Sequence, residues 1–532
     1  MTTDCQMITD DPEIHSKPIT TSKRLAHNTI FNLVALVSRI AIGFFLIPFF
    51  LGQLGENRYG VWVLVGDIFR YRDLLGMGLN SAINRYVPVY LAKKNDEGIQ
   101  RVISTSFFFF LVLAIVLAAA SVVIYCNVGS WFSIEPNLVA TAGVVVLIVG
   151  FCATFAMPLQ LSSAVLSGLQ RYDIMNMVAL ITMLARTALL VFLLLRGYGL
   201  ITMGLVFGFS EIVIRFLQLI FAKKLLRQFS IRFKSVDIKF LGEMLAYGIN
   251  TFLYVLGATI IYKASTLVIG ILLGTAEISQ FAVATAAVLL LSQLLQAFTR
   301  AIKPAVSDLD ARDEHSRVRE IAFLMQKYSL LLIIPSGCFL VVMGREFLWV
   351  WVGEKFKDPA VIGSMSVILA ILTVGHCLRL AQHSNFVVLV GRGDHKVFGV
   401  LTALTALFCI SASVVSVKVF GWGLLGIAWS NSVPMAIVSV LILPSYFNWK
   451  MQITIRESIK QVWLPALLGS LPAVVMISIW RYLARPDSWL EIVSIVIAAA
   501  VLTFVSSWSF SFSGLERKRF LKVLAPILLK KQ

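Results

Sequence analysis

Apolar runs of about 20 residues recur along nearly the whole chain, and each is long enough to cross the hydrocarbon layer of a bilayer as a helix. Hydrophobic residues make up 58% of the 532 residues, against roughly 45–50% in soluble domains, and only 14% of residues are charged. The runs are continuously apolar, whereas strands of a membrane β-barrel alternate in polarity. We therefore expect an all-α polytopic membrane protein and not a soluble enzyme.

Charged residues and helix breakers divide the chain into about fourteen predicted spans. These spans are 26–51, 60–90, 102–126, 138–164, 176–196, 199–222, 244–272, 280–304, 321–344, 360–390, 397–418, 422–446, 461–482 and 489–512. The first 24 residues are too polar for the apolar region of a signal peptide. We expect the first span to act as an uncleaved insertion signal.

Basic residues indicate the orientation of the spans. Most of the 46 Lys and Arg residues fall in alternate loops, with dense clusters at 223–239 and 517–531. The positive-inside rule then places both termini in the cytoplasm of a multi-pass protein of the inner, cytoplasmic membrane. Contact of these loops with anionic lipids explains the net charge of +18, so we expect no nucleic-acid partner.

Six spans are repeated in parallel orientation. Asn28 and Asn250 both open a span, and Leu51 and Leu273, each followed by Gly, both close one. Parallel repeats are typical of secondary transporters, in which two bundles move about a central site. The predicted organisation is a cytoplasmic tail (1–25), an N-lobe of six spans (26–222), a basic linker (223–243), a C-lobe of six spans (244–446), two extra spans (447–512) and a basic cytoplasmic tail (513–532).

Polar residues form stripes on the first two spans. Ionisable side chains inside a membrane are costly and usually face a water-filled cavity or a partner. Asn32 and Arg39 share a helical face, and Asp67, Arg70, Asp73 and Asn80 recur at helical spacing. We interpret these stripes as cavity-lining. The alternative is that Asp67, Arg70 and Asp73 pair with each other near the outer interface.

Later spans carry further charges. Glu211 and Arg215 have the i,i+4 spacing of a self-contained ion pair, which is as plausible as a role in the cavity. Lys263 shares a face with Thr266, and its helix has no acidic residue nearby. We predict that Lys263 lines the cavity.

The tenth span places His376, Arg379 and His383 at helical spacing. Metal binding needs more donors than two histidines, and neither an HExxH motif nor an acidic cluster accompanies them. The six cysteines are scattered without a CxxC pair. We expect no metal site.

Within the predicted spans, cations outnumber anions. The cations are Arg39, Arg70, Arg72, Arg186, Arg215, Lys263 and Arg379, and the anions are Asp67, Asp73 and Glu211. A positive surplus favours an anionic cargo such as a diphosphate or an acidic sugar, because Arg forms forked contacts with phosphate and carboxylate.

No nucleotide-binding GxxxxGK[ST] loop is present, so the energy is expected to come from a proton or sodium gradient and not from ATP. No other cofactor is expected. We predict that Asp67, Asp73 and Glu211 take part in ion coupling.

Three segments carry a resemblance to a known family. "NTIFNLVALVSRIAIGFFLIPFFLGQLGENRYGVWVL" and "LLGMGLNSAINRYV" resemble the first two spans of bacterial polysaccharide-biosynthesis membrane proteins, the Wzx-type O-antigen and exopolysaccharide flippases. "LSGLQRYDIMNMV" is similar to a later turn. The resemblance implies the multidrug, oligosaccharidyl-lipid and polysaccharide exporter superfamily, with two six-helix lobes around a cationic cavity that opens alternately to each side.

For this chain, the resemblance implies the transport of an oligosaccharide linked to undecaprenyl pyrophosphate. Related flippases carry essential cations on spans that match Arg39, Arg70 and Lys263 by location. We predict a substrate site of these three residues with Arg379, Asn32 and Asn80, no catalytic residues, and glycan-assembly enzymes as possible partners.

Alternatives are a lipid II flippase and a multidrug or cation antiporter of the same superfamily. A polysaccharide polymerase or ligase is less favoured, because such enzymes usually carry a long external loop that this chain lacks.

Overall fold

The computed structural model describes residues 21–299, 302–356, 358–392 and 396–518, and all regular elements in these ranges are helices. The helices are α1 (Thr21–Leu54), α2 (Glu56–Arg70), α3 (Arg72–Ala92), α4 (Asp96–Trp131), α5 (Pro136–Gly168), α6 (Tyr172–Leu195), α7 (Leu200–Leu225), α8 (Ile238–Leu272), α9 (Thr275–Thr299), α10 (Ile302–Ala311), α11 (His315–Val342), α12 (Gly344–Val352), α13 (Pro359–Ala381), α14 (His383–Gly391), α15 (Lys396–Lys418), α16 (Gly423–Ile437), α17 (Leu443–Met451), α18 (Ile455–Ser458), α19 (Leu464–Leu483) and α20 (Trp489–Phe510). Two π-helical segments, Val438–Ile442 and Ile459–Trp463, continue α16 and α18 into α17 and α19. Short 3₁₀ turns lie at Phe233–Ser235 and Gly353–Lys355.

The protein is an all-α polytopic membrane protein, as expected. Twelve helical segments of the described chain are long and apolar enough to cross a membrane. α8 adds a thirteenth if its parts Val255–Ile261 and Lys263–Leu272, which meet at 44°, form one span. The remaining predicted span, 60–90, differs from the prediction. It is divided at Tyr71 into α2, which has 15 residues, and α3, and neither helix is among the twelve apolar segments.

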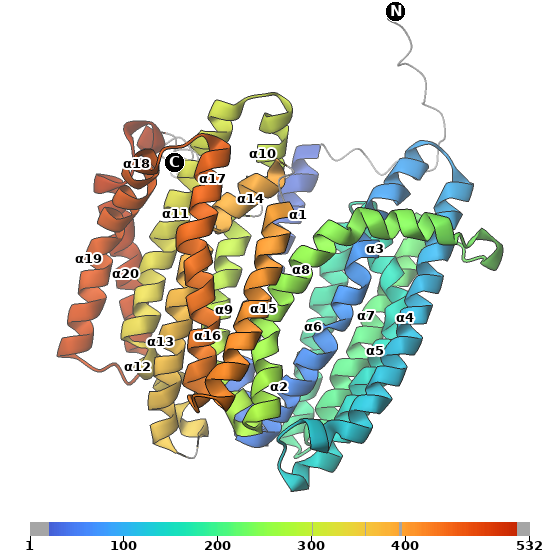
Figure 1. Ribbon diagram of the computed structural model, residues 1–532, viewed down its shortest axis with the longest axis horizontal. Coiled ribbons are helices and arrows are strands. Elements are labelled where there is room, and N and C mark those ends of the chain that lie inside the picture. Colours follow the sequence, from blue (N-terminus) through green and yellow to red (C-terminus); the bar gives the residue numbers. More distant parts are fainter. Residues whose placement is uncertain (1–20, 300–301, 357, 393–395, 519–532) are drawn as a thin grey trace, which may run out of the picture.

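The helices form two groups that are joined by α8 (Figure 1). α2 to α7 make up the N-terminal group, and α9 to α17 make up the C-terminal group. Phe240 and Met244, at the start of α8, belong to the hydrophobic core of the N-terminal group. The later part of α8 packs against α15, where a Cβ on Gly257 would crowd the backbone of Ala403. One helix therefore contributes to both groups.

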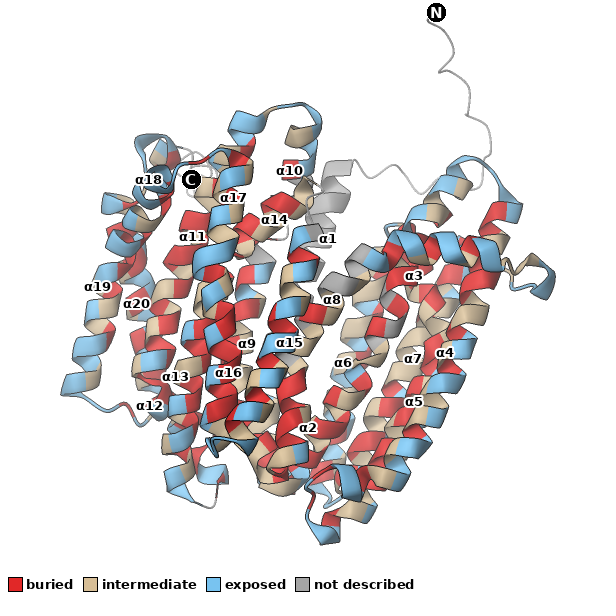
Figure 2. Ribbon diagram, in the orientation of Figure 1, coloured by how far each residue is buried: buried red, intermediate tan, exposed pale blue. Residues whose placement is uncertain are grey.

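Many large apolar side chains point outward from the helix groups. Phe209, Leu407 and Leu490 are more than half exposed, and the exposed residues run along the outer faces of the helices (Figure 2). Contiguous exposed apolar surface of this extent is expected where side chains contact lipid.

The two ends of the molecule differ. At one end, which we call the narrow end, α1 meets α2 and α8 meets α9. At the other end α1 begins and α7 leads into α8, and the two groups stand further apart (Figure 1). We call this the basic end, because Lys223, Lys224 and Arg232 lie there. A Cβ on Gly60 of α2 would overlap the Thr275 carbonyl of α9, and Thr275 Oγ1 donates to Asn57 Oδ1 at 3.1 Å. The Ser133 amide donates to the Gly270 carbonyl at 2.7 Å. These contacts join the two groups at the narrow end.

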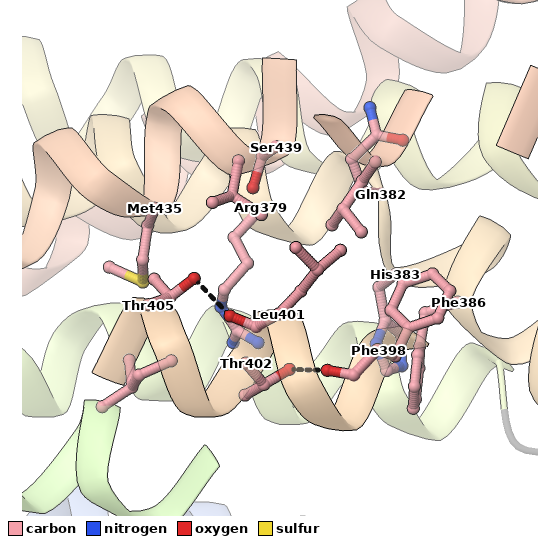
Figure 3. Close-up of a pocket in the computed structure, with 13 residues that line it drawn as sticks. Arg379, Gln382, His383, Phe386, Phe398, Leu401, Thr402, Thr405, Met435 and Ser439 are labelled. Carbon is pink, nitrogen blue, oxygen red and sulfur yellow. Dashed lines mark hydrogen bonds between the residues drawn. The ribbon is translucent and has the colours of Figure 1, made fainter. Parts of the chain in front are cut away.

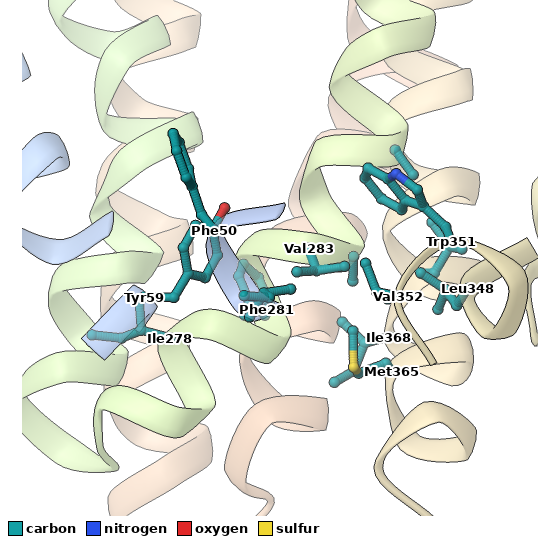
Figure 4. Packing of buried hydrophobic residues seen from close by; sticks show 14 of the residues in the cluster. Phe50, Tyr59, Ile278, Phe281, Val283, Leu348, Trp351, Val352, Met365 and Ile368 are labelled. Atoms are coloured by element: carbon teal, nitrogen blue, oxygen red, sulfur yellow. The ribbon is translucent and has the colours of Figure 1, made fainter. Parts of the chain in front are cut away.

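An apolar cluster fills the narrow end around these contacts (Figure 4). It brings together Phe50 of α1, Tyr59 of α2, Phe281 of α9 and Trp351 of α12, all of them at most 6% exposed. Trp351 Nε1 also donates to the carbonyl of Phe44 in α1 at 3.0 Å. α1 is thereby fixed against the C-terminal group.

α19 and α20 pack beside α11, outside the two groups. Lys327 Nζ of α11 lies 2.7 Å from Glu516 Oε1, just beyond α20, and both side chains are 7% exposed. Tyr328 Oη donates to the same carboxylate oxygen at 2.9 Å. This buried ion pair ties the end of α20 to α11.

Candidate functional site

Asp67 of α2 lies in a cluster of charged and polar side chains at the contact with α8. Asp67 is 4% exposed, and its Oδ1 lies 2.8 Å from Lys263 Nζ. Thr266 Oγ1 donates to Asp67 Oδ2 at 2.8 Å. Arg70 Nε lies 3.7 Å from Asp67 Oδ1, and 65% of the Arg70 side chain is exposed. We call these four residues the Asp67 cluster.

Helical spacing produces the cluster. Asp67 and Arg70 are three residues apart on α2, as are Lys263 and Thr266 on α8, so each pair shares a face. A buried carboxylate is tolerated where an opposite charge and hydrogen-bond donors compensate it. α8 supplies both to Asp67. The cluster therefore links α2 to α8 by an ion pair and a hydrogen bond.

The structure changes the interpretation of two predicted residues. Lys263 has no acidic residue nearby on its own helix, as expected, but Asp67 of α2 pairs with it in this conformation. The alternative local pairing of Asp67 with Arg70 is present at 3.7 Å, but it is the longer of the two contacts. The side chains of Asp73 and Asn32 lie outside the described residues.

Glu211 of α7 pairs with Arg72 of α3, whose Nη2 lies 3.0 Å from Glu211 Oε2. Glu211 therefore has an ion-pair partner on another helix, in addition to Arg215 at i,i+4 on its own helix. Arg215 Nη1 donates to Gln218 Oε1 at 3.3 Å, among its other interactions. Two of the predicted ion-coupling acids, Asp67 and Glu211, are thus held by cations from other helices.

Among the predicted substrate-binding residues, two arginines are exposed and one asparagine has a buried oxygen without a partner among the described residues. Arg39, near the middle of α1, is exposed and has no hydrogen bond or ion pair within the described part of the chain. Asn80 Oδ1 of α3 is buried and has no hydrogen-bond partner among the described residues. Buried polar atoms are nearly always satisfied by protein, water or ligand. Arg39 and the exposed part of Arg70 are therefore accessible to a ligand, and Asn80 Oδ1 has unused capacity to accept a hydrogen bond.

Arg379 lies apart from the Asp67 cluster. It lines a pocket inside the C-terminal group that is partly open to the exterior, and His383 lines the same pocket. His376 does not line it: this residue is buried, and its Nδ1 lies 2.9 Å from the Leu372 carbonyl. The two histidines expected on one face are separated by the break between α13 and α14 at Gln382.

In the residues that the structure describes, no group of three or more His, Cys, Asp and Glu side chains is placed to hold a metal ion.

Sequence reasoning missed how the charged residues are paired. Asp67 and Lys263 are far apart in the chain, as are Arg72 and Glu211, and helical spacing indicates only which residues share a face. Arg85 was also missed: its guanidinium lies 4.5 Å from the centroid of the Tyr247 ring on α8. Nothing in either helix alone indicates that these faces meet.

Comparisons with known proteins agree on the family and fold. A family model described as "Polysaccharide biosynthesis protein" matches residues 55–361. The uncharacterized membrane protein EpsK of Bacillus subtilis (strain 168) is 20% identical over 502 residues, which cover 92% of this chain and 96% of that protein.

Two solved structures are similar in fold. The lipid II flippase MurJ in an inward closed conformation has a TM-score of 0.68 at 16% identity, with 91% of this chain and 98% of that chain covered. An inward-facing multidrug resistance MATE family transporter of the MOP superfamily has a TM-score of 0.64 at 14% identity. The match covers 80% of this chain and 94% of that chain. At these identities the likeness shows the fold alone.

Proposed function

Because this chain belongs to the polysaccharide biosynthesis protein family, whose model matches more than half of it, we propose that it is a flippase for a lipid-linked oligosaccharide. It is a multi-pass membrane protein with the fold of transporters and flippases and not of an enzyme. The proposed cargo is an O-antigen or exopolysaccharide repeat unit attached to undecaprenyl pyrophosphate.

The observation that carries this proposal is the exposure of arginines within the spans. Arg39 is exposed near the middle of α1, and most of the Arg70 side chain is exposed at the end of α2. An arginine at membrane depth is costly unless it faces water or an anion. We assign Arg39 and Arg70 to the diphosphate, because the guanidinium fork matches phosphate oxygens. Asn32 and Asn80 would bind neighbouring hydroxyl groups.

Ion coupling is assigned to the Asp67 cluster. A proton or sodium ion on Asp67 would weaken the attraction between Asp67 and Lys263, which joins α2 to α8. Lys263 would then be available to the anionic cargo, and α2 and α8 would be less strongly held together. A gradient of that ion would bias the two arrangements of the helix groups. The polyprenyl tail would stay in lipid throughout.

The basic end is assigned to the cytoplasm. Lys223, Lys224 and Arg232 lie at this end, where contact with anionic lipids favours them. Both termini would be cytoplasmic, and transport would run from the cytoplasmic to the outer leaflet of the cytoplasmic membrane. Enzymes that assemble the same glycan would act on each side.

Reconstituted vesicles test this function. Purified full-length protein is placed in liposomes with a fluorescent undecaprenyl-diphosphate oligosaccharide, and movement between leaflets is followed by a membrane-impermeant quencher. We expect Arg39→Gln and Arg70→Gln to reduce the rate at least about tenfold, because each removes a charged hydrogen bond to the cargo. Arg345→Gln, at an exposed residue of α12, is the control and should transport normally.

Other outcomes would redirect the assignment. Wild-type protein that is inert towards every lipid-linked saccharide but moves a cationic drug would contradict the flippase proposal. Wild-type protein that moves lipid II and restores peptidoglycan synthesis in cells lacking their own lipid II flippase would place the chain with that alternative.

A further inference from the structure

A second feature of the C-terminal group is the pocket that Arg379 lines. Its walls come from α8, from α13 and α14, from α15, and from the end of α16 with the π-helical segment and the start of α17 that follow it. Two of these walls depart from regular α-helix, at Gln382 and at Val438–Ile442. Interruptions of this kind in membrane helices recur at functional sites, because they release backbone groups and make room for a ligand.

The polar groups around the pocket suit a ligand that carries one anionic group and several hydroxyl groups. Arg379 extends into the pocket, with the hydroxyl residues Thr402, Thr405 and Ser439 on neighbouring helices (Figure 3). The Thr402 and Thr405 hydroxyls donate to carbonyls of their own helix, so their oxygens still have capacity to accept. No acidic residue is among the described residues that line the pocket. A cationic ligand would find no counter-charge there.

Two aromatic rings form the apolar side of the pocket. The ring centroids of Phe386 and Phe398 lie 5.1 Å apart, with the planes at 66°. Both rings line the pocket beside His383 (Figure 3). A pyranose ring presents C–H groups on its faces and hydroxyls around its rim, and it therefore complements aromatic rings next to hydroxyl side chains. A diphosphate has no apolar face.

The pocket is separate from the Asp67 cluster, although the same turn of α8 contributes to both. Ile261 lines the pocket, whereas Lys263 reaches Asp67. Residues two apart on a helix point to nearly opposite sides. α8 therefore stands between the two sites, so both can be occupied by different parts of one cargo.

We propose that this pocket binds a sugar residue that carries a single carboxylate, within the saccharide of the cargo. This assignment rests on the proposed function and divides the cargo between two sites. The diphosphate would bind at Arg39 and Arg70, and the acidic sugar would bind at Arg379. A single arginine matches the charge of one carboxylate and does not balance that of a diphosphate.

Binding of a free sugar tests the pocket directly. Full-length protein in nanodiscs is titrated with methyl glucuronide, with methyl glucoside, which lacks the carboxylate, and with inorganic diphosphate, and binding is followed by saturation-transfer NMR and calorimetry. We expect methyl glucuronide to bind most tightly. Arg379→Gln should weaken its binding at least about tenfold, Arg379→Lys should weaken it less, and Arg345→Gln should leave it unchanged.

Three results would overturn the assignment of the pocket. These are equal binding of the glucuronide and the glucoside, tighter binding of diphosphate that depends on Arg379, and binding of glucuronide that Arg379→Gln leaves intact. Retention of the wild-type elution profile by Arg379→Gln shows that a loss of binding is not a loss of folding.

The two proposals fail in different ways. Vesicle transport of a lipid-linked saccharide without Arg379-dependent binding of glucuronide would leave the flippase standing and remove the pocket. Arg379-dependent binding of glucuronide without transport of any lipid-linked saccharide would remove the flippase and leave an acidic-sugar site.

Discussion

At the scale of single residues, the Asp67–Lys263 ion pair joins two helices within the membrane-spanning part of the molecule. Asp67 is buried, Lys263 is largely buried, and they belong to helices far apart in the sequence. Each side chain removes the electrostatic cost of burying the other, so the effect of changing one depends on whether the other is changed too.

Single and double replacements should therefore differ. We expect Asp67→Leu or Lys263→Met alone to lower the free energy of unfolding by about 3–5 kcal/mol, because each leaves an uncompensated buried charge. The double replacement should cost less than either single one. Denaturation in mild detergent measures the stabilities, and additive single effects would contradict the coupling. Under the proposed mechanism, the stable double variant should still fail in ion-coupled transport.

A second residue-scale prediction concerns pH at the end of α20. Burial raises the pKa of Glu516, but hydrogen bonds from Lys327 and Ser513 outweigh it and hold the pKa below its ordinary value of 4.5. A lowered folded-state pKa gives stability that is present above pH 4.5 and is lost as the pH falls through the folded value.

Hydrogen exchange measures this dependence. Amide exchange in α20 should increase as the pH falls below 4.5, after correction for the intrinsic pH dependence of exchange. In Glu516→Gln, exchange should be faster at neutral pH and should lose this acid-dependent step. A Glu516→Gln protein with the same pH profile as the wild type would show that another group is responsible.

At the scale of elements, α8 shows what the sequence could and could not predict. The apolar run 244–272 predicted the span, and the other predicted spans except 60–90 match apolar helical segments in the same way. The bend in α8 and its contact with α3 were not predictable, because they depend on faces of helices that are distant in the sequence. The charges on span 60–90 could be recognised from their spacing in the sequence. The division at Tyr71 could not, because it too depends on contacts with helices that are distant in the sequence.

The crossing of α3 and α8 depends on two glycines. A Cβ on Gly248 would overlap the backbone of Gly78, whereas a Cβ on Gly242 of the same helix would meet no atom within 4 Å. We expect Gly248→Ala to destabilise the protein by about 1–3 kcal/mol through overpacking. Gly242→Ala should stabilise it by up to about 1 kcal/mol, since alanine favours helix. Thermal unfolding of the two variants provides a matched comparison, and equal effects would contradict the close approach of α3 and α8.

At the scale of the whole molecule, the helix groups are joined at the narrow end and stand further apart at the basic end (Figure 1). The sequence indicated a duplication of six spans, and this organisation into lobes stays a prediction. If transport needs the narrow end to open, a covalent link across it should stop transport. Asn57 and Thr275 are suitable positions, since their side-chain oxygens lie 3.1 Å apart on α2 and α9.

A reversible cross-link tests this requirement. Asn57→Cys with Thr275→Cys, in a background without the six native cysteines, should lose transport on oxidation and regain it on reduction. Each single cysteine variant should be insensitive to the oxidant. Full transport by the cross-linked protein would show that the narrow end does not open during the cycle.

The apolar cluster at the narrow end also bears on the electrical state of the membrane. A space wide enough for an oligosaccharide would short-circuit the membrane potential if water filled it from one side to the other. Phe50, Tyr59, Phe281 and Trp351 present little that an ion could exchange for its hydration shell, and hydrophobic constrictions of this kind exclude water. In this conformation the molecule is therefore an electrical insulator, whatever the width at its basic end.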